Sequence, residues 1–286
     1  NDGSPDRCAE ICDKHAEADN RIKVIHQANQ GVSSARNSGL TAATGQFVTL
    51  VDADDTIQAD MVEKMVGIAQ GEGADIVSCG ISRTGSAHSR HPRPDATCAK
   101  AGRKILQEFL ENKTDQSACA RLYDADLIRN IRFDPDINVN EDKLYIYSAF
   151  SRASLHVSTE LPLYNYHQVE DSVSHSEFSE IVFDIEKVAD LIFGDVMRTA
   201  PDLQKYANVQ LIRSLMELYT HMTLSNDART LYAQDYRRLR NRIIEKGFRQ
   251  LDTKLATLRL FVIIYGSSLY VPLAFLYARV FRRPRR

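Results

Sequence analysis

The sequence predicts an α/β domain followed by a helical extension, and three observations indicate this fold class. Short apolar runs bounded by turn residues alternate with helix-like patterns over the first part of the chain. One of these runs, residues 47–51, has no polar alternation and predicts a strand that is buried on both faces. Residues 177–258 carry apolar residues every three or four positions, which predicts helices without further clusters of catalytic residue types.

Composition limits the classes of function. The chain has 286 residues, and 43% of them are hydrophobic, so it can bury a full core. Its formal net charge of -2 argues against a bulk electrostatic grip on nucleic acid, and we expect no nucleic-acid partner. Five cysteines without a paired spacing, in a long chain, predict reduced thiols and a cytoplasmic protein.

The first elements follow from caps and periodicity. Ser4 can cap a helix that has Pro5 at its first position, and residues 22–26 read as a strand. Residues 31–40 read as a loop that turns into a helix, capped by Ser33 or Ser34. Helix entries point backbone N–H groups outward, so Arg36, one turn inside, marks a candidate seat for an anionic group.

The remaining elements continue this reading. We expect a strand at residues 76–81 and a surface loop or hairpin at 84–99. Periodic apolar residues predict helices at 56–71, 104–112, 118–131, 144–150, 181–197, 203–224 and 228–246.

Two acidic clusters are the candidate chemical groups. Asp52, Asp54 and Asp55 follow the strand at 47–51, where an open α/β sheet binds ligands. Oxygen-rich carboxylate clusters suit Mg or Mn, although these acids could instead form a solvated turn that caps the next helix. Glu141 and Asp142 open an apolar helix, where they either complement the helix dipole or supply a general base.

Several motifs together carry a family resemblance. In order, they are Asn1-Asp2-Gly3-Ser4, Gly31-x-Ser33-x-Ala35-Arg36-Asn37-x-Gly39, Ala43-x-Gly45, Val51-Asp52-Ala53-Asp54-Asp55, Glu141-Asp142, Leu163-Tyr164-Asn165-Tyr166 and Asp171-Ser172-Val173-Ser174. Their order and spacing resemble the inverting family 2 glycosyltransferases with the Rossmann-like A-type fold, over residues 1–176. The resemblance implies that the first strand, the first helix and most of the second strand of the family would precede Asn1, as in an N-terminally truncated chain.

The resemblance implies roles for the residues on the donor side. Asp2 corresponds to the carboxylate that contacts the nucleobase, and Arg36 to the arginine near the nucleotide. Asp52 and Asp54 resemble the Asp-x-Asp element, which reaches the ribose and, through Mg or Mn, the diphosphate. Asp54 is the first candidate metal ligand, with Asp52 as the second. The role of Asp55 in the same turn stays open.

The resemblance also implies the reaction. Glu141 and Asp142 correspond to the catalytic acidic pair, with Asp142 as the base that deprotonates the acceptor hydroxyl. His167 is a candidate contact for the diphosphate or metal, or simply a histidine at a strand end. The expected function is inverting transfer from a nucleotide sugar, in particular a UDP-sugar, to a saccharide or lipid-linked acceptor in polysaccharide and cell-envelope glycan synthesis.

Two other functions fit parts of the sequence. Asp52-Ala53-Asp54-Asp55-Thr56 after a buried strand also resembles the element of haloacid-dehalogenase-like phosphatases, in which the first Asp is the nucleophile. That element normally opens its domain, whereas two other motifs precede it here. A truncated, non-catalytic binding module is the third possibility.

The last segment differs from the helices before it. No charged residue occurs from Leu260 to Ala278, and five arginines follow by residue 286. The run is short for a membrane span and is interrupted by Gly266 and Pro272. We expect residues 259–286 to contact the inner face of the plasma membrane, with arginines on anionic headgroups; the alternative is a final helix docked on the protein.

Overall fold

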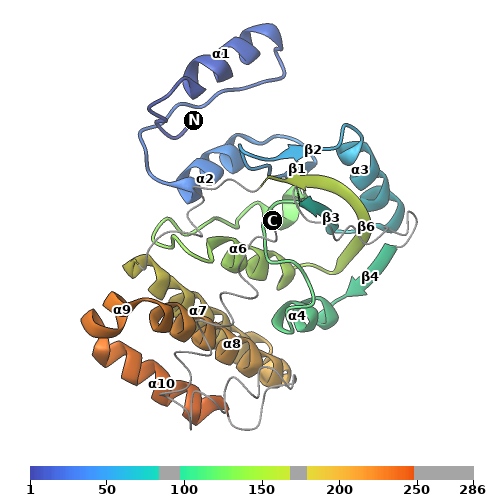
Figure 1. The fold of residues 1–286 in the computed structure, drawn as a ribbon. Helices are drawn as coiled ribbons and strands as arrows, with labels where there is room; N and C mark the ends of the chain where they lie inside the picture. Colours follow the sequence, from blue (N-terminus) through green and yellow to red (C-terminus); the bar gives the residue numbers. More distant parts are fainter. Residues whose placement is uncertain (84–96, 168–178, 248–286) are drawn as a thin grey trace. The chain divides into compact units, whose positions relative to one another are not determined.

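A computed structural model describes residues 1–83, 97–167 and 179–247 (Figure 1). The chain divides into two compact units, each of which is described by itself. Unit 1 comprises Asn1–Ser82, Pro92–Gly102 and Ser117–Asn165, and unit 2 comprises Arg83–His91, Arg103–Gln116 and Tyr166–Arg286. The segment at 259–286, for which we expect membrane contact, lies outside the described residues.

Unit 1 contains a six-stranded sheet in the strand order β1-β5-β3-β6-β2, with β4 beside β6. The pairs β1–β5, β3–β5, β2–β6 and β4–β6 are antiparallel. In Figure 1 the long strand β6 curves through the sheet and reaches β2 near one end and β4 near the other. The strands are β1 (Phe47–Thr49), β2 (Thr56–Ile57), β3 (Ile76–Arg83), β4 (Thr97–Ala101), β5 (Arg121–Asp124) and β6 (Leu155–Tyr166).

The curved β6 passes close to the backbone of β3 at Gly80. A Cβ atom at this position would lie 2.7 Å from the carbonyl oxygen of Glu160. Since Cβ atoms do not approach backbone oxygens this closely, only glycine lets the two strands meet here.

The helices of unit 1 carry site residues and part of the core. α3 (Met61–Glu72) buries Met61, Met65 and Ala69. Their four-residue spacing forms one apolar face, which packs on Val77 and Leu163 of the sheet. The other helices of this unit are α1 (Cys8–Ala18), α2 (Val32–Ala42), α5 (Ala125–Ile128) and α6 (Glu141–Phe150).

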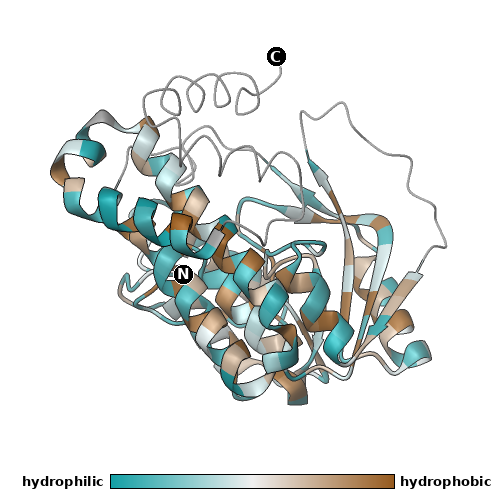
Figure 2. Ribbon diagram, turned by 90° about the horizontal axis from the view of Figure 1, so that it is seen from below, coloured by the Kyte–Doolittle hydropathy of each residue, from teal (hydrophilic) through white to brown (hydrophobic). Residues whose placement is uncertain are grey.

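Unit 2 is helical in its described part, as the predicted extension requires. α7 and α8 pack along each other, and the buried apolar residues of α8 recur around most of its circumference. Figure 2 shows hydrophobic and hydrophilic residues interspersed along the helices, as expected when one side is packed and the other is solvated. The helices are α4 (Arg103–Leu110), α7 (Asp184–Thr199), α8 (Gln204–Leu224), α9 (Asn226–Leu231) and α10 (Ala233–Gly247), with 3-10 turns η2 (Glu180–Phe183) and η3 (Pro201–Leu203).

Within residues 1–83, 97–167 and 179–247, no helix combines the length and apolar content needed to cross a bilayer.

Several predicted elements differ from the structure. Residues 22–26 form neither helix nor strand. The predicted helix at 118–131 is wrong, because residues 121–124 form β5 between β1 and β3 and only 125–128 are helical. The predicted helix at 56–71 begins later, at Met61, since Thr56 and Ile57 pair with β6.

The strand that precedes the acidic turn is shorter and less buried than predicted. β1 covers only Phe47–Thr49, all three residues are partly buried, and Val51 is 44% exposed. The expectation of burial on both faces is therefore wrong. The physical reason is that β1 lies at one end of the strand order in the described sheet and pairs with β5.

Candidate active site

Helix α2 begins at a turn that holds Asp2. Gly31, which precedes the helix, has φ of +85°, a conformation that favours glycine. The backbone N–H groups of Gln30 and Gly31 donate to the Asp2 carboxylate at 3.0 and 2.8 Å, and the Gln27 side chain donates at 2.8 Å. These bonds, led by the one from Gln30, hold the pKa of Asp2 below its ordinary value. The N–H of Gly31 at the entry of α2 is therefore already bonded to Asp2 and not to a ligand.

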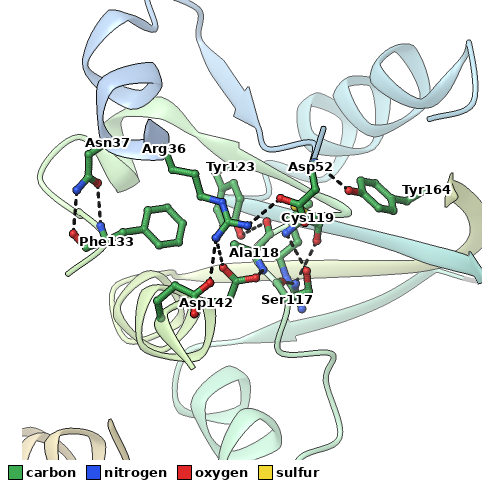
Figure 3. Close-up of polar contacts among 12 residues, drawn as sticks. Arg36, Asn37, Asp52, Ser117, Ala118, Cys119, Tyr123, Phe133, Asp142 and Tyr164 are labelled. Carbon is green, nitrogen blue, oxygen red and sulfur yellow. Dashed lines mark hydrogen bonds and ion pairs between the residues drawn. The ribbon is translucent and has the colours of Figure 1, made fainter. Parts of the chain in front are cut away.

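Arg36 lies on the second turn of α2 and joins three carboxylates, two of which, Asp52 and Asp142, are labelled beside its guanidinium in Figure 3. Its Nη2 donates to Asp52 at 2.8 Å, and its Nη1 donates to Asp142 at 2.6 Å and to Glu141 at 3.3 Å. The side chain is only 13% exposed, and it lies over the ring of Phe133, 5.1 Å from the centroid. Burial opposes its charge, but Asp142 and Asp52 more than compensate and raise the pKa of Arg36.

Glu141 and Asp142 form the first turn of α6, which follows Asn140 in the left-handed conformation. Asp142 Oδ1 accepts from Arg36, and Oδ2 accepts from the backbone N–H of Ala118 at 2.9 Å (Figure 3). Burial raises the pKa of both acids, and the neighbouring Asp142 raises that of Glu141 further. Both groups therefore bind a proton more readily than exposed carboxylates, which suits a general base.

The acidic turn after β1 is held by Tyr164 of β6. The Tyr164 hydroxyl donates to Asp55 Oδ2 at 2.7 Å and accepts from the backbone N–H of Asp52 at 3.2 Å. Tyr164 is 1% exposed, so it fixes both ends of the turn from the core side. Asp54, between them, is exposed. Asp52 thus faces Arg36, Asp55 faces Tyr164, and Asp54 lies at the surface.

The acidic turn is the candidate site for a divalent cation. No group of three His, Cys, Asp or Glu residues in the described segments is placed to hold a metal. Mg typically takes only one or two protein carboxylates and completes its shell with waters and substrate phosphates. An exposed Asp54 next to Asp52 fits a cation of that kind, which is shared with a diphosphate, and does not fit a closed protein cage.

Two residues outside our candidate set contribute to the site. The Asn37 side chain donates to the carbonyl of Phe133 and accepts from its N–H, both at 2.9 Å, as the paired dashed lines in Figure 3 show. It thereby fixes the ring under Arg36. Asn37 and Tyr164 both lie within the quoted motifs, so their positions were visible in the sequence although their contacts were not.

The candidate residues do not all meet at one point. The structure brings together Arg36, Asp52, Glu141 and Asp142 through direct contacts. Asp2 lies at the entry of the same helix as Arg36. His167 directly follows β6 and belongs to unit 2, so it is not placed relative to this cluster.

Comparisons with known proteins agree with this fold. Residues 1–132 match glycosyl transferase family 2. The uncharacterized glycosyltransferase EpsJ of Bacillus subtilis is 34% identical over 184 residues, which cover 61% of this chain and 53% of EpsJ. The minor teichoic acid biosynthesis protein GgaB of the same organism is 29% identical over 181 residues, which cover 61% of this chain and 19% of GgaB. The chain spans about half the length of the first curated relatives it matches.

A solved structure shows the fold. The crystal structure of Staphylococcus aureus TarS 1-349 in complex with UDP-GlcNAc matches with a TM-score of 0.69 at 19% identity, covering 97% of this chain and 81% of that one. The expected A-type fold with a helical C-terminal region is therefore confirmed. Over residues 1–132 the chain matches glycosyl transferase family 2, and its fold is that of the A-type glycosyltransferases.

Proposed function

We propose that this protein transfers a sugar from a nucleotide donor to a saccharide or lipid-linked acceptor, with inversion at the anomeric carbon. The observation that carries the proposal is the bridge made by Arg36. This one side chain joins Asp52, on the turn expected to meet the donor, to the Glu141–Asp142 pair expected to meet the acceptor. A site for group transfer needs both partners within reach of each other.

Asp142 is the proposed base. Its two oxygens are each anchored by one hydrogen bond, which fixes the plane of the carboxylate and leaves one lone pair on each oxygen for a ligand. As the acceptor oxygen bonds to the anomeric carbon, its proton passes to Asp142 and the bond from that carbon to the phosphate oxygen breaks. Attack opposite the leaving group inverts the configuration in a single displacement, so no covalent intermediate forms.

The leaving nucleoside diphosphate carries the negative charge of the reaction. Arg36 pairs with three carboxylates, one of which, Asp52, lies on the acidic turn. Among the described contacts it is the cation nearest to that turn. Asp54, together with Asp52, would hold Mg or Mn, which stabilises charge on a diphosphate when bound. Asp2, at the entry of α2, is the proposed contact for the nucleobase, and His167 is a further candidate for the diphosphate.

The class of donor and acceptor is proposed from the relatives. TarS was solved with UDP-GlcNAc and with UDP, which supports a UDP-sugar donor. GgaB is named for teichoic acid biosynthesis, which supports an acceptor in cell-envelope glycan synthesis. Such an acceptor fits a cytoplasmic protein at the inner face of the plasma membrane, held there through residues 259–286.

The test is release of nucleoside diphosphate from a panel of UDP-, GDP- and dTDP-sugars, with and without acceptor saccharides, in Mg, in Mn and with a chelator. We expect release from one UDP-sugar that requires the divalent cation, together with an inverted anomeric product by NMR. An aryl phosphate in the same panel serves as the control for a phosphatase. Hydrolysis of the aryl phosphate without release from any nucleotide sugar would reject the proposal.

A further inference from the structure

The only described backbone group that holds Asp142 is the N–H of Ala118, in the segment Ser117–Cys119 that precedes β5. The opposite side of the Ala118 residue is held as well. The hydroxyl of Tyr123, on β5, donates to the Ala118 carbonyl at 2.8 Å (Figure 3). Tyr123 is 0% exposed and Ala118 is 0% exposed, so neither bond competes with water.

Two further contacts keep this segment in place. Arg121, which is 2% exposed, donates from Nη1 to the carbonyls of Ser117 and Cys119 on either side of Ala118. Ala120 has φ of +58°, a left-handed conformation that is strained for a residue with a Cβ, and its carbonyl accepts from the N–H of Cys79 at 3.0 Å. Strained backbone persists only where its surroundings hold it, which identifies the segment as a built support.

We infer that Tyr123 is a positioning residue for Asp142, acting through the backbone of Ala118, whose carbonyl accepts from Tyr123 and whose N–H donates to Asp142 Oδ2. The inference rests on the proposed function, in which Asp142 is the base. Tyr123 is buried and acts only through Ala118. Its hydroxyl holds the carbonyl of the peptide group that follows Ala118, and it thereby restrains the backbone of Ala118 and the direction of its N–H. Removal of that hydroxyl loosens this restraint, so the Asp142 carboxylate can turn away from the acceptor.

Tyr145 of α6 provides a matched control for this hydroxyl. Its ring lies edge-on to that of Tyr123, with 5.9 Å between centroids, and it is 1% exposed. Its hydroxyl has no hydrogen-bond partner among the described residues. Tyr123→Phe and Tyr145→Phe therefore remove the same atom from neighbouring buried rings, but only the first removes a bond to the Ala118 carbonyl.

The experiment compares both variants with the wild-type protein by turnover and by hydrogen exchange. We expect Tyr123→Phe to lower kcat about tenfold, because misplaced reacting groups lose rate steeply. The KM for the donor should stay unchanged, and Tyr145→Phe should leave both constants at the wild-type level. Assays well below the melting temperature of each variant separate this effect from unfolding.

Exchange of the Ala118 amide, followed by NMR, reads the same support without turnover. We expect the amide to exchange at least several-fold faster in Tyr123→Phe than in Tyr145→Phe. Equal exchange and equal kcat in the two variants would overturn the inference. A wild-type protein that turns over no donor, but shows the unequal exchange, would count against the proposed function and leave the support by Tyr123 standing.

Discussion

Two clusters of arginine and carboxylate, one in each unit, differ in how many arginines bond to each buried acid. In unit 1 a single Arg36 serves Asp52, Glu141 and Asp142. In unit 2 the carboxylate of Glu186 receives two bonds of 2.7 Å from Arg238 and a further one from Arg242, which also pairs with Asp190. In unit 1 one arginine therefore serves three acids, whereas in unit 2 one acid, Glu186, accepts bonds from two arginines.

The pKa values of the acids follow the number of arginines that bond to each of them. Burial raises the pKa of Glu186, but the bonds from Arg238 and Arg242 outweigh it and hold the pKa below its ordinary value. In unit 1 burial wins, and the pKa of both Glu141 and Asp142 is raised despite Arg36. A saturated carboxylate is locked as an anion and serves structure, whereas an undersupplied one can take up a proton and serve chemistry.

The largest expected effect comes from Asp142→Asn. An amide cannot accept the proton of the acceptor hydroxyl, so we expect kcat to fall by about a thousandfold, the range for a general base. Donor affinity, measured by calorimetry, should change little. Asp126→Asn, at an exposed carboxylate of the same unit, is the control and should keep full turnover. Full turnover in Asp142→Asn would remove the functional half of the comparison.

Glu186→Gln is the counterpart in unit 2. Loss of the anion leaves two arginines without their shared acceptor, and we expect the free energy of unfolding to fall by about 2 kcal/mol. Arg238 is 49% exposed, which keeps the effect below that of a fully buried pair. Asp195→Asn, in an exposed pair on the same helix, should cost less than about 0.5 kcal/mol.

Urea unfolding checks both of these values, and transfer assays should show the wild-type kcat for Glu186→Gln. Equal stability of Glu186→Gln and wild type would show that saturation by arginine does not stabilise unit 2.

Glu141→Gln has the smallest expected effect and the opposite sign. The folded pKa of Glu141 lies above its ordinary value of 4.5, so its ionised form lowers the stability of the folded protein at pH 7. We expect the amide to raise the free energy of unfolding by about 0.5 kcal/mol at pH 7. The gain should shrink as pH falls through the folded pKa and vanish near pH 4.5.

The pH dependence of Glu186 runs the other way. Its pKa is lowered, so its contribution to stability is present above 4.5 and is lost as pH falls below that value. Unfolding curves of both variants between pH 4 and 8 test the two signs together. A loss of stability in both variants at pH 7 would contradict the contrast between the clusters.

Local patterns predicted those elements whose partners are near in the chain. α7 and α8 appear where the apolar spacing placed them. Residues 118–131 misled the prediction because Leu122, Ala125 and Ile128 recur every three positions, as in a helical stripe. Leu122 instead pairs with Thr49 and Val77 across the sheet. Distant strand pairing overrode the local propensity.

The site was predictable in its residue types but not in its contacts. The motifs placed Arg36 near a nucleotide, yet its contacts to Glu141 and Asp142 span 105 and 106 residues. Periodicity carries no information on such pairs. The support of Asp142 by Ala118 and Tyr123 was missed for the same reason, since a backbone N–H leaves no signature in the sequence. The roles of all the candidate residues, which are Asp2, Arg36, Asp52, Asp54, Glu141, Asp142 and His167, stay predictions.

Arg36 and Asn37 are consecutive residues on α2, and they have different tasks. One binds the carboxylates, and the other binds the backbone of Phe133 through both its N–H and its carbonyl. A rigid helix transmits a displacement to neighbouring side chains together. Any movement of α2 therefore has two effects at once. It changes the charge around the proposed base, Asp142, and it shifts the ring of Phe133.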